Sequence, residues 1–339
     1  MNAPRRPTMA EVADLAGVSL KTASRVINGS QGVSPSKTKA VRQAVESLGY
    51  RSNRGAATLR SGSSTIVGLI VRDMSNPFYS GLAAGAADSA QEHGLLLMTA
   101  SSEGDIHRQS RLIDTMMEYR PRALLITPAQ GEDPALVYES EMGTPIVALD
   151  QPPDGITCPY VSFPNTEATK EAMSQALSTG ARTCGILLDD DSLKTMPARL
   201  QGVLSAIHEA GAPPPQDKHI LRAHTHREAV ASTTHLCTIA PDVEIIFCGN
   251  NVLPEGAINS VLQCGLSPIV VAFDPLPLAR ELPLRIITIT HDSTIMGQLG
   301  MHAALGANPP THSLCPTQIY LNTRMRASHP HLTEQRSQS

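Results

Sequence analysis

The sequence predicts a small all-α helix-turn-helix headpiece followed by an α/β domain of two doubly wound halves. Three observations lead to this fold class. Up to residue 62, short helical segments rich in small residues are separated by glycines and carry 10 basic and 3 acidic residues. From residue 65, nearly continuous apolar runs alternate with helical stretches, which is typical of parallel strands covered on both faces. The alternation occurs in two sets, and 339 residues suffice for two or three domains.

The first helix of the headpiece is expected to begin after Thr8. Thr8 and Glu11 have the spacing of a capping box, in which each side chain binds the backbone N–H of the other residue. Gly17 is expected to end this segment in a tight turn, because glycine tolerates a positive φ. The predicted apolar face consists of Val12, Ala13, Leu15 and Ala16.

A second and a third helix follow at short intervals. Val18 is expected to be a buried plug after the turn, and Ser19 to cap a helix over 20–27 that ends at Asn28-Gly29. A third helix should begin after Ser34, with Pro35 at its first position, and end at Gly49. The inward residues of these two helices are Ala23, Val26 and Ile27, then Val41, Ala44, Val45 and Leu48. Two short helices joined by a glycine turn, with a third behind, predict a helix-turn-helix unit.

The charge distribution indicates what this unit meets. The first 62 residues have a net charge of +7, whereas the rest of the chain has −11. A basic head on an acidic body favours contact of the head with a polyanion, and polar groups on the second helix can reach a major groove. The residues left outward or near the start of this helix are Leu20, Lys21, Thr22, Ser24 and Arg25. A solvated basic face and a three-helix bundle for protein contact are the alternatives.

The segment "PTMAEVADLAGVSLKTASRVINGSQGVSP" resembles the headpiece of the lactose/galactose repressor family of bacterial transcription regulators. The resemblance continues into "SLGYRSNRGAATLRSG" and covers most of the chain through "YLNTRMRAS". It implies double-stranded operator DNA as a partner. With the residue pattern, it places DNA contacts at Thr8, Ser19, Leu20, Lys21, Thr22, Ser24, Arg25, Asn28, Asn53, Ala57 and Leu59.

Residues 52–63 match the hinge of that family. The stretch from Arg54 to Arg60 is too short for a stable isolated helix and is expected to fold on DNA. The resemblance implies that Leu59 enters the minor groove and kinks the site. Ser52, Gly55 and Ala57 depart from the residues most frequent in the family hinge, and the glycine disfavours a helix by about 1 kcal/mol.

The body contains seven predicted strands and five predicted helices. The strands are expected over 65–71, 95–101, 122–127, 145–150, 183–189, 243–249 and 268–274. The helices are expected over 77–94, 107–119, 167–180, 196–211 and 254–265. The resemblance implies a periplasmic-binding-protein-like effector domain, in which the chain crosses three times between the halves. We place the crossings near Phe163, Thr290 and Cys315.

The expected domain organisation follows from these crossings. The headpiece is 1–51, the hinge 52–63, the effector-binding and dimerisation domain 64–327, and a loose tail 328–339. One half combines 64–162 with 291–314, and the other combines 163–290 with 315–327. A homodimer is expected, because the chain lacks the leucine-heptad helix of the family's tetramers.

Ligands of open α/β sheets bind beyond the carboxyl ends of the strands, so residues at those ends are candidate effector contacts. Asp, Asn and Arg pair with hydroxyl groups, and an aromatic ring can cover a sugar face. The resemblance places effector contacts at Phe78, Tyr79, Asp150, Arg199, Asn250 and Asp274. Arg199 as a salt-bridge residue and Asp274 as a helix cap are alternatives. Asn250-Asn251 and Asp274-Pro275 depart from the frequent family pairs Asn-Asp and Asp-Asp.

No catalytic pattern, metal site or cofactor motif is evident, so an enzyme is not expected. His224 and His226 have the spacing of surface residues, and Asp189 to Asp191 suggest a solvated loop. Six scattered cysteines and the lack of a signal peptide or membrane span predict a cytoplasmic, nucleoid-associated protein. We expect a transcription regulator, in particular a repressor, controlled by a sugar or sugar acid that acts as an inducer or, conversely, as a corepressor. The alternative is a cytosolic sugar-binding protein or sugar-metabolising enzyme with an accessory helix-turn-helix.

Overall fold

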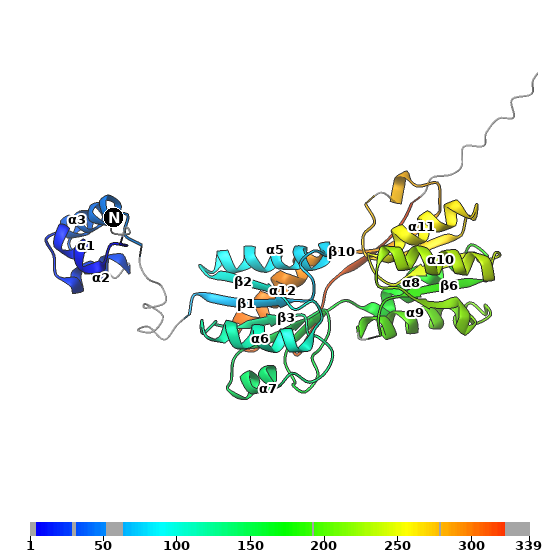
Figure 1. Ribbon diagram of the computed structural model, residues 1–339, viewed down its shortest axis with the longest axis horizontal. Helices are drawn as coiled ribbons and strands as arrows, with labels where there is room; N and C mark the ends of the chain where they lie inside the picture. Colours follow the sequence, from blue (N-terminus) through cyan, green and yellow to red (C-terminus); the bar gives the residue numbers. More distant parts are fainter. Residues whose placement is uncertain (1–4, 29–31, 52–63, 192, 278, 323–339) are drawn as a thin grey trace, which may run out of the picture. The chain divides into compact units, whose positions relative to one another are not determined.

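The computed structural model describes residues 5–28, 32–51, 64–191, 193–277 and 279–322 (Figure 1). The chain divides into two compact units, residues 1–65 and 66–339. The hinge contacts expected at Asn53, Ala57 and Leu59 and the tail expected at 328–339 lie outside the described residues.

The first unit contains the three expected helices, α1 (Met9–Leu15), α2 (Leu20–Ile27) and α3 (Pro35–Leu48). The capping box at α1 is confirmed, since the Glu11 N–H donates to Thr8 Oγ1 over 3.3 Å and the Thr8 N–H donates to Glu11 Oε2 over 2.6 Å. Gly17 has the positive φ, 62°, that the turn between α1 and α2 requires. The buried core of this unit is formed by Val12, Ala13, Ala23, Val41 and Ala44.

Three details of the headpiece differ from the expectation. Leu15 is 58% exposed, because at about 100° per residue it lies well off the centre of the face formed by its apolar neighbours. Val18 was expected to be buried after the turn, but it is half-buried at the edge of the core. The Ser34 side chain does not cap α3, because its hydroxyl is hydrogen bonded to the hydroxyl of Ser36, with the two oxygens 3.2 Å apart.

The second unit holds two six-stranded sheets (Figure 1). The first sheet is parallel, in the order β11-β5-β4-β3-β1-β2. Its strands are β1 (Ile66–Val71), β2 (Leu96–Ser101), β3 (Leu124–Ile126), β4 (Ile146–Leu149), β5 (Tyr160–Ser162) and β11 (His312–Leu314). Its helices are α5 (Pro77–Glu92), α6 (Ile106–Met117), α7 (Pro134–Glu141) and α12 (Ser293–Leu305).

The second sheet has the order β12-β10-β9-β8-β6-β7, with only β12 antiparallel. Its strands are β6 (Cys184–Leu188), β7 (Ile220–Arg222), β8 (Ile245–Cys248), β9 (Ile269–Phe273), β10 (Ile286–His291) and β12 (Thr317–Leu321). Its helices are α8 (Asn165–Leu177), α9 (Thr195–Glu209), α10 (His226–Ile239) and α11 (Leu253–Gln263), with short 3-10 turns at Asp217–His219 and Ala279–Glu281.

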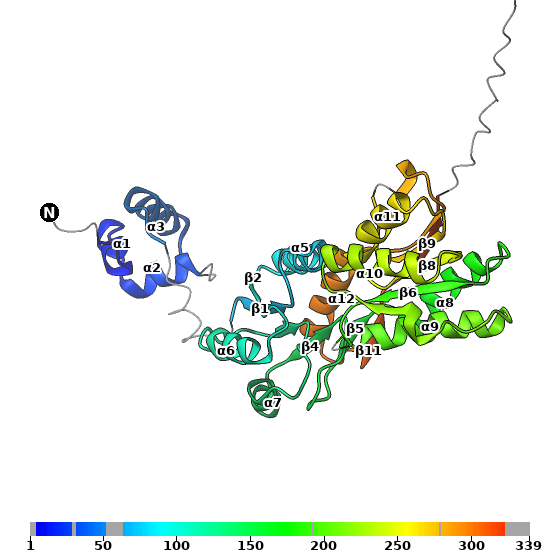
Figure 2. The same cartoon turned by 45° about the vertical axis from the view of Figure 1, so that its right-hand side comes forward.

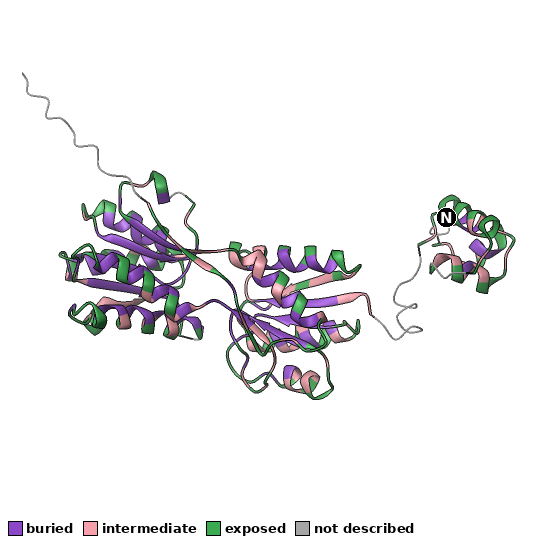
Figure 3. Ribbon diagram, turned by 180° about the vertical axis from the view of Figure 1, so that it is seen from behind, coloured by how far each residue is buried: buried purple, intermediate pink, exposed green. Residues whose placement is uncertain are grey.

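Alternate residues of the strands bury themselves on opposite faces of each sheet. Leu69 of β1 packs in the core that contains α5 and α12, whereas its neighbour Ile70 packs with α6 and α7. In the second sheet, Ile186 faces α8 and α9, whereas Leu187 faces α10 and α11 (Figure 2). The central strands are therefore buried almost throughout, as their continuous apolar sequence predicts (Figure 3). The doubly wound fold class is confirmed.

The chain passes three times between the two halves. It leaves the first sheet after β5 at Ser162 and enters α8, returns after β10 at His291 to form α12, and crosses again between β11 and β12, at residues 315–316. In Figure 1, β10 is labelled at the junction between the two halves. These connections bring the ends of the strands of both sheets to one pocket.

The contact between α5 and α12 depends on two glycines. A Cβ on Gly85 would overlap the Thr294 carbonyl, and a Cβ on Gly297 would overlap the Leu82 carbonyl. Both neighbours are backbone atoms of packed helices, so neither can move without shifting a helix. Gly297→Ala is expected to destabilise the second unit by about 1–3 kcal/mol, because this overpacking exceeds the gain of about 1 kcal/mol in helix propensity. Urea unfolding followed by circular dichroism measures the change; an unaltered midpoint would contradict the close approach.

Candidate functional site

A pocket of about 610 Å³ lies in the second unit, where strands of both sheets end. All six of the expected effector residues line it, namely Phe78, Tyr79, Asp150, Arg199, Asn250 and Asp274. Further polar residues that line it are Arg72, Asp73, Ser75, Asn76, Ser101, Glu103, Asp189, Thr195, His224 and Asn251. Pockets of about 300–1,000 Å³ are the usual size for small-molecule sites.

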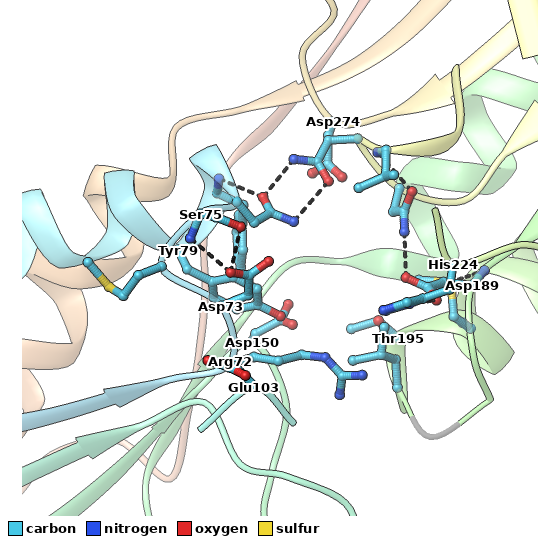
Figure 4. Close-up of a pocket in the computed structure, with 18 of the residues that line it drawn as sticks. Arg72, Asp73, Ser75, Tyr79, Glu103, Asp150, Asp189, Thr195, His224 and Asp274 are labelled. Atoms are coloured by element: carbon cyan, nitrogen blue, oxygen red, sulfur yellow. Dashed lines mark hydrogen bonds and ion pairs between the residues drawn. The ribbon is translucent and has the colours of Figure 1, made fainter. Parts of the chain in front are cut away.

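The strand ends explain why these side chains meet. Arg72 follows β1 and Asp150 follows β4 in the first sheet, while Asp189 follows β6 and Asp274 follows β9 in the second. Residues of the first half lie on one side of the pocket in Figure 4 and His224, Asp189 and Thr195 on the other. Asp150 and Asp274 adopt positive φ values of 71° and 86°, which are uncommon outside glycine. Such backbone strain is found most often at functional sites.

Arg199 on α9 is buried and has neutral partners. Its Nε–H donates to Asn165 Oδ1 over 2.8 Å, a second N–H donates to the Gly249 carbonyl, and the guanidinium lies 3.5 Å from the centre of the Phe273 ring. Within the part of the chain that the structure describes, no carboxylate forms an ion pair with it, which argues against a simple salt-bridge role. Burial lowers the pKa of Arg199, although nearby carboxylates oppose that change. The remaining N–H groups are available to a ligand.

Asp150 is a buried carboxylate that makes no side-chain hydrogen bond to any described residue. Burial raises its pKa, while the charge of Arg199 acts in the opposite direction. A carboxylate in this position lacks donors, and the hydroxyl groups of a bound ligand can supply them. Asp150 and Arg199 together thus present an acceptor and a set of donors to the same cavity.

Asp274 is held by His291, whose Nε2 contacts Asp274 Oδ1. No helix follows Asp274 directly, so it is not a helix cap. Burial raises the pKa of Asp274, but the hydrogen bond and charge of His291, with the charge of Arg199, outweigh it and lower the pKa overall. His291 also stacks against Phe163, with ring centres 4.1 Å apart. Sequence reasoning missed His291, although it ends the apolar run of β10.

Asn250 and Asp189 form a second cluster. Asn250 donates to Asp189 Oδ2 over 2.7 Å and accepts the backbone N–H groups of Val252 and Leu253, so its amide is already used to anchor the start of α11. Asp189 also contacts His224 Nδ1 at 2.8 Å and is only 5% exposed. The expectation of a solvated loop was therefore wrong for Asp189. Its position directly after a buried strand was the available signal.

Side chains also connect the two halves across the pocket. The amides of Asn76 and Asn251 bind each other reciprocally, over 3.3 and 2.7 Å. Lys194 binds from the second half to Asp154 and to the Pro152 carbonyl, at 2.7 and 2.9 Å. Its backbone N–H donates to Gln151 Oε1 over 2.9 Å. A ligand between the halves can therefore alter contacts that set their relative arrangement.

The headpiece presents its expected DNA-contacting residues largely to solvent. Leu20 is 55% exposed, and Lys21 and Arg25 are also exposed on α2. Thr22 and Ser24 are half-buried, and Asn28 is exposed at the end of the helix, where it donates to Ser24 Oγ over 3.3 Å. The hydroxyls of Thr8 and Ser19 cap α1 and α2, so their first role is to fix the helix ends. The first turn of α2 is thereby open to a partner.

None of the helices that the structure describes is long and apolar enough to span a membrane. Among the described residues, no group of three or more His, Cys, Asp or Glu side chains has the geometry to hold a metal ion.

Comparison with known families identifies both units. Residues 8–53 match bacterial regulatory proteins of the lacI family. Residues 64–307 match the periplasmic binding proteins and sugar binding domain of the LacI family. The chain belongs to the LacI family. This LacI-family protein is accordingly a transcriptional regulator with a helix-turn-helix DNA-binding domain and a domain of the sugar-binding type.

Curated relatives of this LacI-family regulator extend over nearly the whole chain. The HTH-type transcriptional regulator CelR of Thermobifida fusca is 28% identical over 311 residues, covering 88% of this chain and 91% of the relative. The HTH-type transcriptional regulator GalS of Salmonella typhimurium is 25% identical over 323 residues, covering 94% and 95%. The Escherichia coli ribose operon repressor is 28% identical over 302 residues, covering 87% and 91%.

Solved structures agree with the fold of the LacI-family chain. A CelR–cellobiose complex is 26% identical, covers 93% of this chain and 98% of its own, and has a TM-score of 0.68. The Lac repressor dimer bound to operator and the anti-inducer ONPF is 19% identical, covers 94% and 99%, and has a TM-score of 0.83, which shows the fold alone.

Proposed function

We propose that this regulator represses transcription at an operator and releases the DNA when a sugar or sugar acid binds the pocket of its second unit. The observation that carries this proposal is the convergence of Asp150, Arg199 and Asp274 on one cavity. A buried acceptor, a buried fork of donors and a second carboxylate can pair with adjacent hydroxyl groups. The α2 helix of the headpiece supplies the exposed residues that read the operator.

The proposed coupling uses the contacts between the halves. A ligand that pairs with Asp150 on one side and with Arg199 and Asp274 on the other has a different affinity for each relative arrangement of the halves. Such a difference in affinity is what shifts a conformational equilibrium. We assign 1–51 to the DNA-binding domain, 52–63 to the hinge, and 64–327 to the effector domain, and we propose a homodimer as the operator-binding form.

The test is operator binding by the full chain, measured by fluorescence anisotropy with a labelled fragment of its own promoter. Sugars and sugar acids that raise the melting temperature of the protein are added at increasing concentration. The proposal expects at least one of them to weaken operator binding without changing binding to random DNA. Tighter operator binding with every stabilising compound would replace induction by corepression. Turnover of these compounds by the pure protein would instead support an enzyme.

A further inference from the structure

Among the charged residues of the pocket, Arg72 and Asp150 are the two whose side chains form neither a hydrogen bond nor an ion pair with a described residue. Four of the five carboxylates that line the pocket are already held within the protein. Asp189 pairs with His224, Asp274 with His291, and Glu103 with Arg108 over 2.7 Å. Asp73 accepts both the N–H and the hydroxyl of Ser75, over 2.8 and 2.7 Å. Asp150 alone remains without a hydrogen-bond partner among the described residues.

The two arginines show a corresponding difference. Arg199 is fixed by Asn165, the Gly249 carbonyl and the Phe273 ring. The Arg72 side chain, in contrast, forms neither a hydrogen bond nor an ion pair with any residue that the structure describes, although it is half-buried and lines the pocket. The fold therefore positions this guanidinium in the pocket without giving it a hydrogen-bond acceptor among the described residues.

The position of the Arg72 guanidinium depends on Gly104, which lies directly beside it. A Cβ on Gly104 would lie 2.9 Å from Arg72 Cζ and 3.1 and 3.2 Å from its two terminal nitrogens. The whole guanidinium thus rests against the glycine, which also has a positive φ of 73°. Because this contact is with a carbon atom, it orients the guanidinium without using its N–H groups.

We propose that Arg72 binds a carboxylate of the effector, and that the effector is a polyhydroxylated acid such as a uronate or an aldonate rather than a neutral sugar. This inference rests on the proposed function, since it concerns the same pocket. A guanidinium holds a carboxylate through two parallel hydrogen bonds, which a single hydroxyl group does not offer. The hydroxyl groups of the same ligand would pair with Asp150 and Arg199.

The excess of acidic residues in the pocket does not exclude an acid. In an ion pair within the protein, the two charges partly cancel each other at a distance. The paired carboxylates also already accept hydrogen bonds from protein donors. Glu103 pairs with Arg108, whereas Asp150 lies close enough to Arg72 for the charge of the guanidinium to lower the pKa of that carboxyl. If a neutral ligand covered Arg72, the guanidinium would lose water and gain no counter-charge, which is unfavourable.

The experiment uses the full chain and three matched pairs of compounds, D-galacturonate with D-galactose, D-glucuronate with D-glucose, and D-gluconate with D-glucitol. Thermal shift finds the compounds that stabilise the protein, and isothermal titration calorimetry measures their affinity. We expect at least one acid to bind more tightly than its neutral partner. Arg72→Ala is expected to lower the affinity for that acid roughly 10- to 100-fold and to change the affinity for the neutral partner far less.

Two further variants distinguish the role of the Arg72 guanidinium from a general loss of structure. Arg72→Lys keeps the charge but not the fork, so it should recover part of the acid affinity. Arg111→Ala removes an exposed arginine on α6 outside the pocket and should leave both affinities unchanged. The inference is overturned if no acid of the panel stabilises the protein, or if Arg72→Ala affects an acid and its neutral partner equally. Operator release by a neutral sugar would overturn it while leaving the proposed function intact.

Discussion

Asp274→Ala is expected to abolish the release of operator DNA by the effector while operator affinity stays at the wild-type level. Asp274 lies in the pocket, in a different unit from the headpiece; His291 binds one of its carboxylate oxygens, and we propose that Asp274 also accepts a hydroxyl group of the ligand. A hydrogen bond to a charged group contributes about 1.5–3 kcal/mol, so its loss is expected to lower the affinity for the effector roughly 10- to 150-fold. Fluorescence anisotropy with and without an effector found by thermal shift measures the response.

A more conservative change distinguishes the ligand contact from a structural role. Asp274 has a φ of 86°, which asparagine tolerates better than alanine does. Asp274→Asn also keeps an acceptor for His291 and removes only the charge, so it should fold normally and require a higher effector concentration. Asp242→Asn, at an exposed position outside the pocket, is the matched control. If Asp274→Asn responds at the wild-type effector concentration, the pocket contact has been assigned to the wrong residue.

Arg25→Ala is expected to weaken specific operator binding by about 1–3 kcal/mol, with a much smaller effect on random DNA. Arg25 is exposed on α2, the helix proposed to enter the major groove, and arginine binds the acceptor edge of guanine through two hydrogen bonds. The measurement is a pair of anisotropy titrations at one salt concentration, one with the operator and one with random DNA of equal length.

The control for this change is Arg42→Ala, which removes the same charge from an exposed position on α3. Its loss should be small and similar on both DNAs. If Arg25→Ala weakens operator and random DNA by the same factor, Arg25 contacts phosphate rather than a base edge, because phosphate contacts carry no sequence information.

Sequence reasoning was most successful where local chemistry alone determines structure. The capping box of Thr8 and Glu11 and the turn at Gly17 follow from a few neighbouring residues. Seven of the parallel strands, β1, β2, β3, β4, β6, β8 and β9, were expected from their apolar runs, whereas the short strands β5, β7 and β11 were not. The six expected effector residues were placed by the resemblance, and they line one pocket because the strands of each parallel sheet end at the same edge.

The partners of each side chain were not predictable from the sequence, because they come from distant parts of the chain. His291 reaches Asp274 only because β9 and β10 are neighbours, and Asn76 meets Asn251 across 175 residues. Asn250 was expected to contact the effector, yet its amide is bound on both sides within the second half. Helices such as α7, α10 and α12 were not predicted, since burial on a sheet rather than a strong apolar period stabilises them.

The three crossings between the halves limit the ways in which those halves can move. Two bodies joined by one strand have nearly full rotational freedom, whereas each added connection removes some of it. Here the connections after β5, β10 and β11 lie beside the pocket, and β10 pairs with β12 through the antiparallel ladder from Ile287 to His291. Any rotation of one half against the other must therefore be compatible with all three connections at once. If the proposed effector binds between the halves, its size therefore acts on their relative orientation only through the movements that all three connections permit.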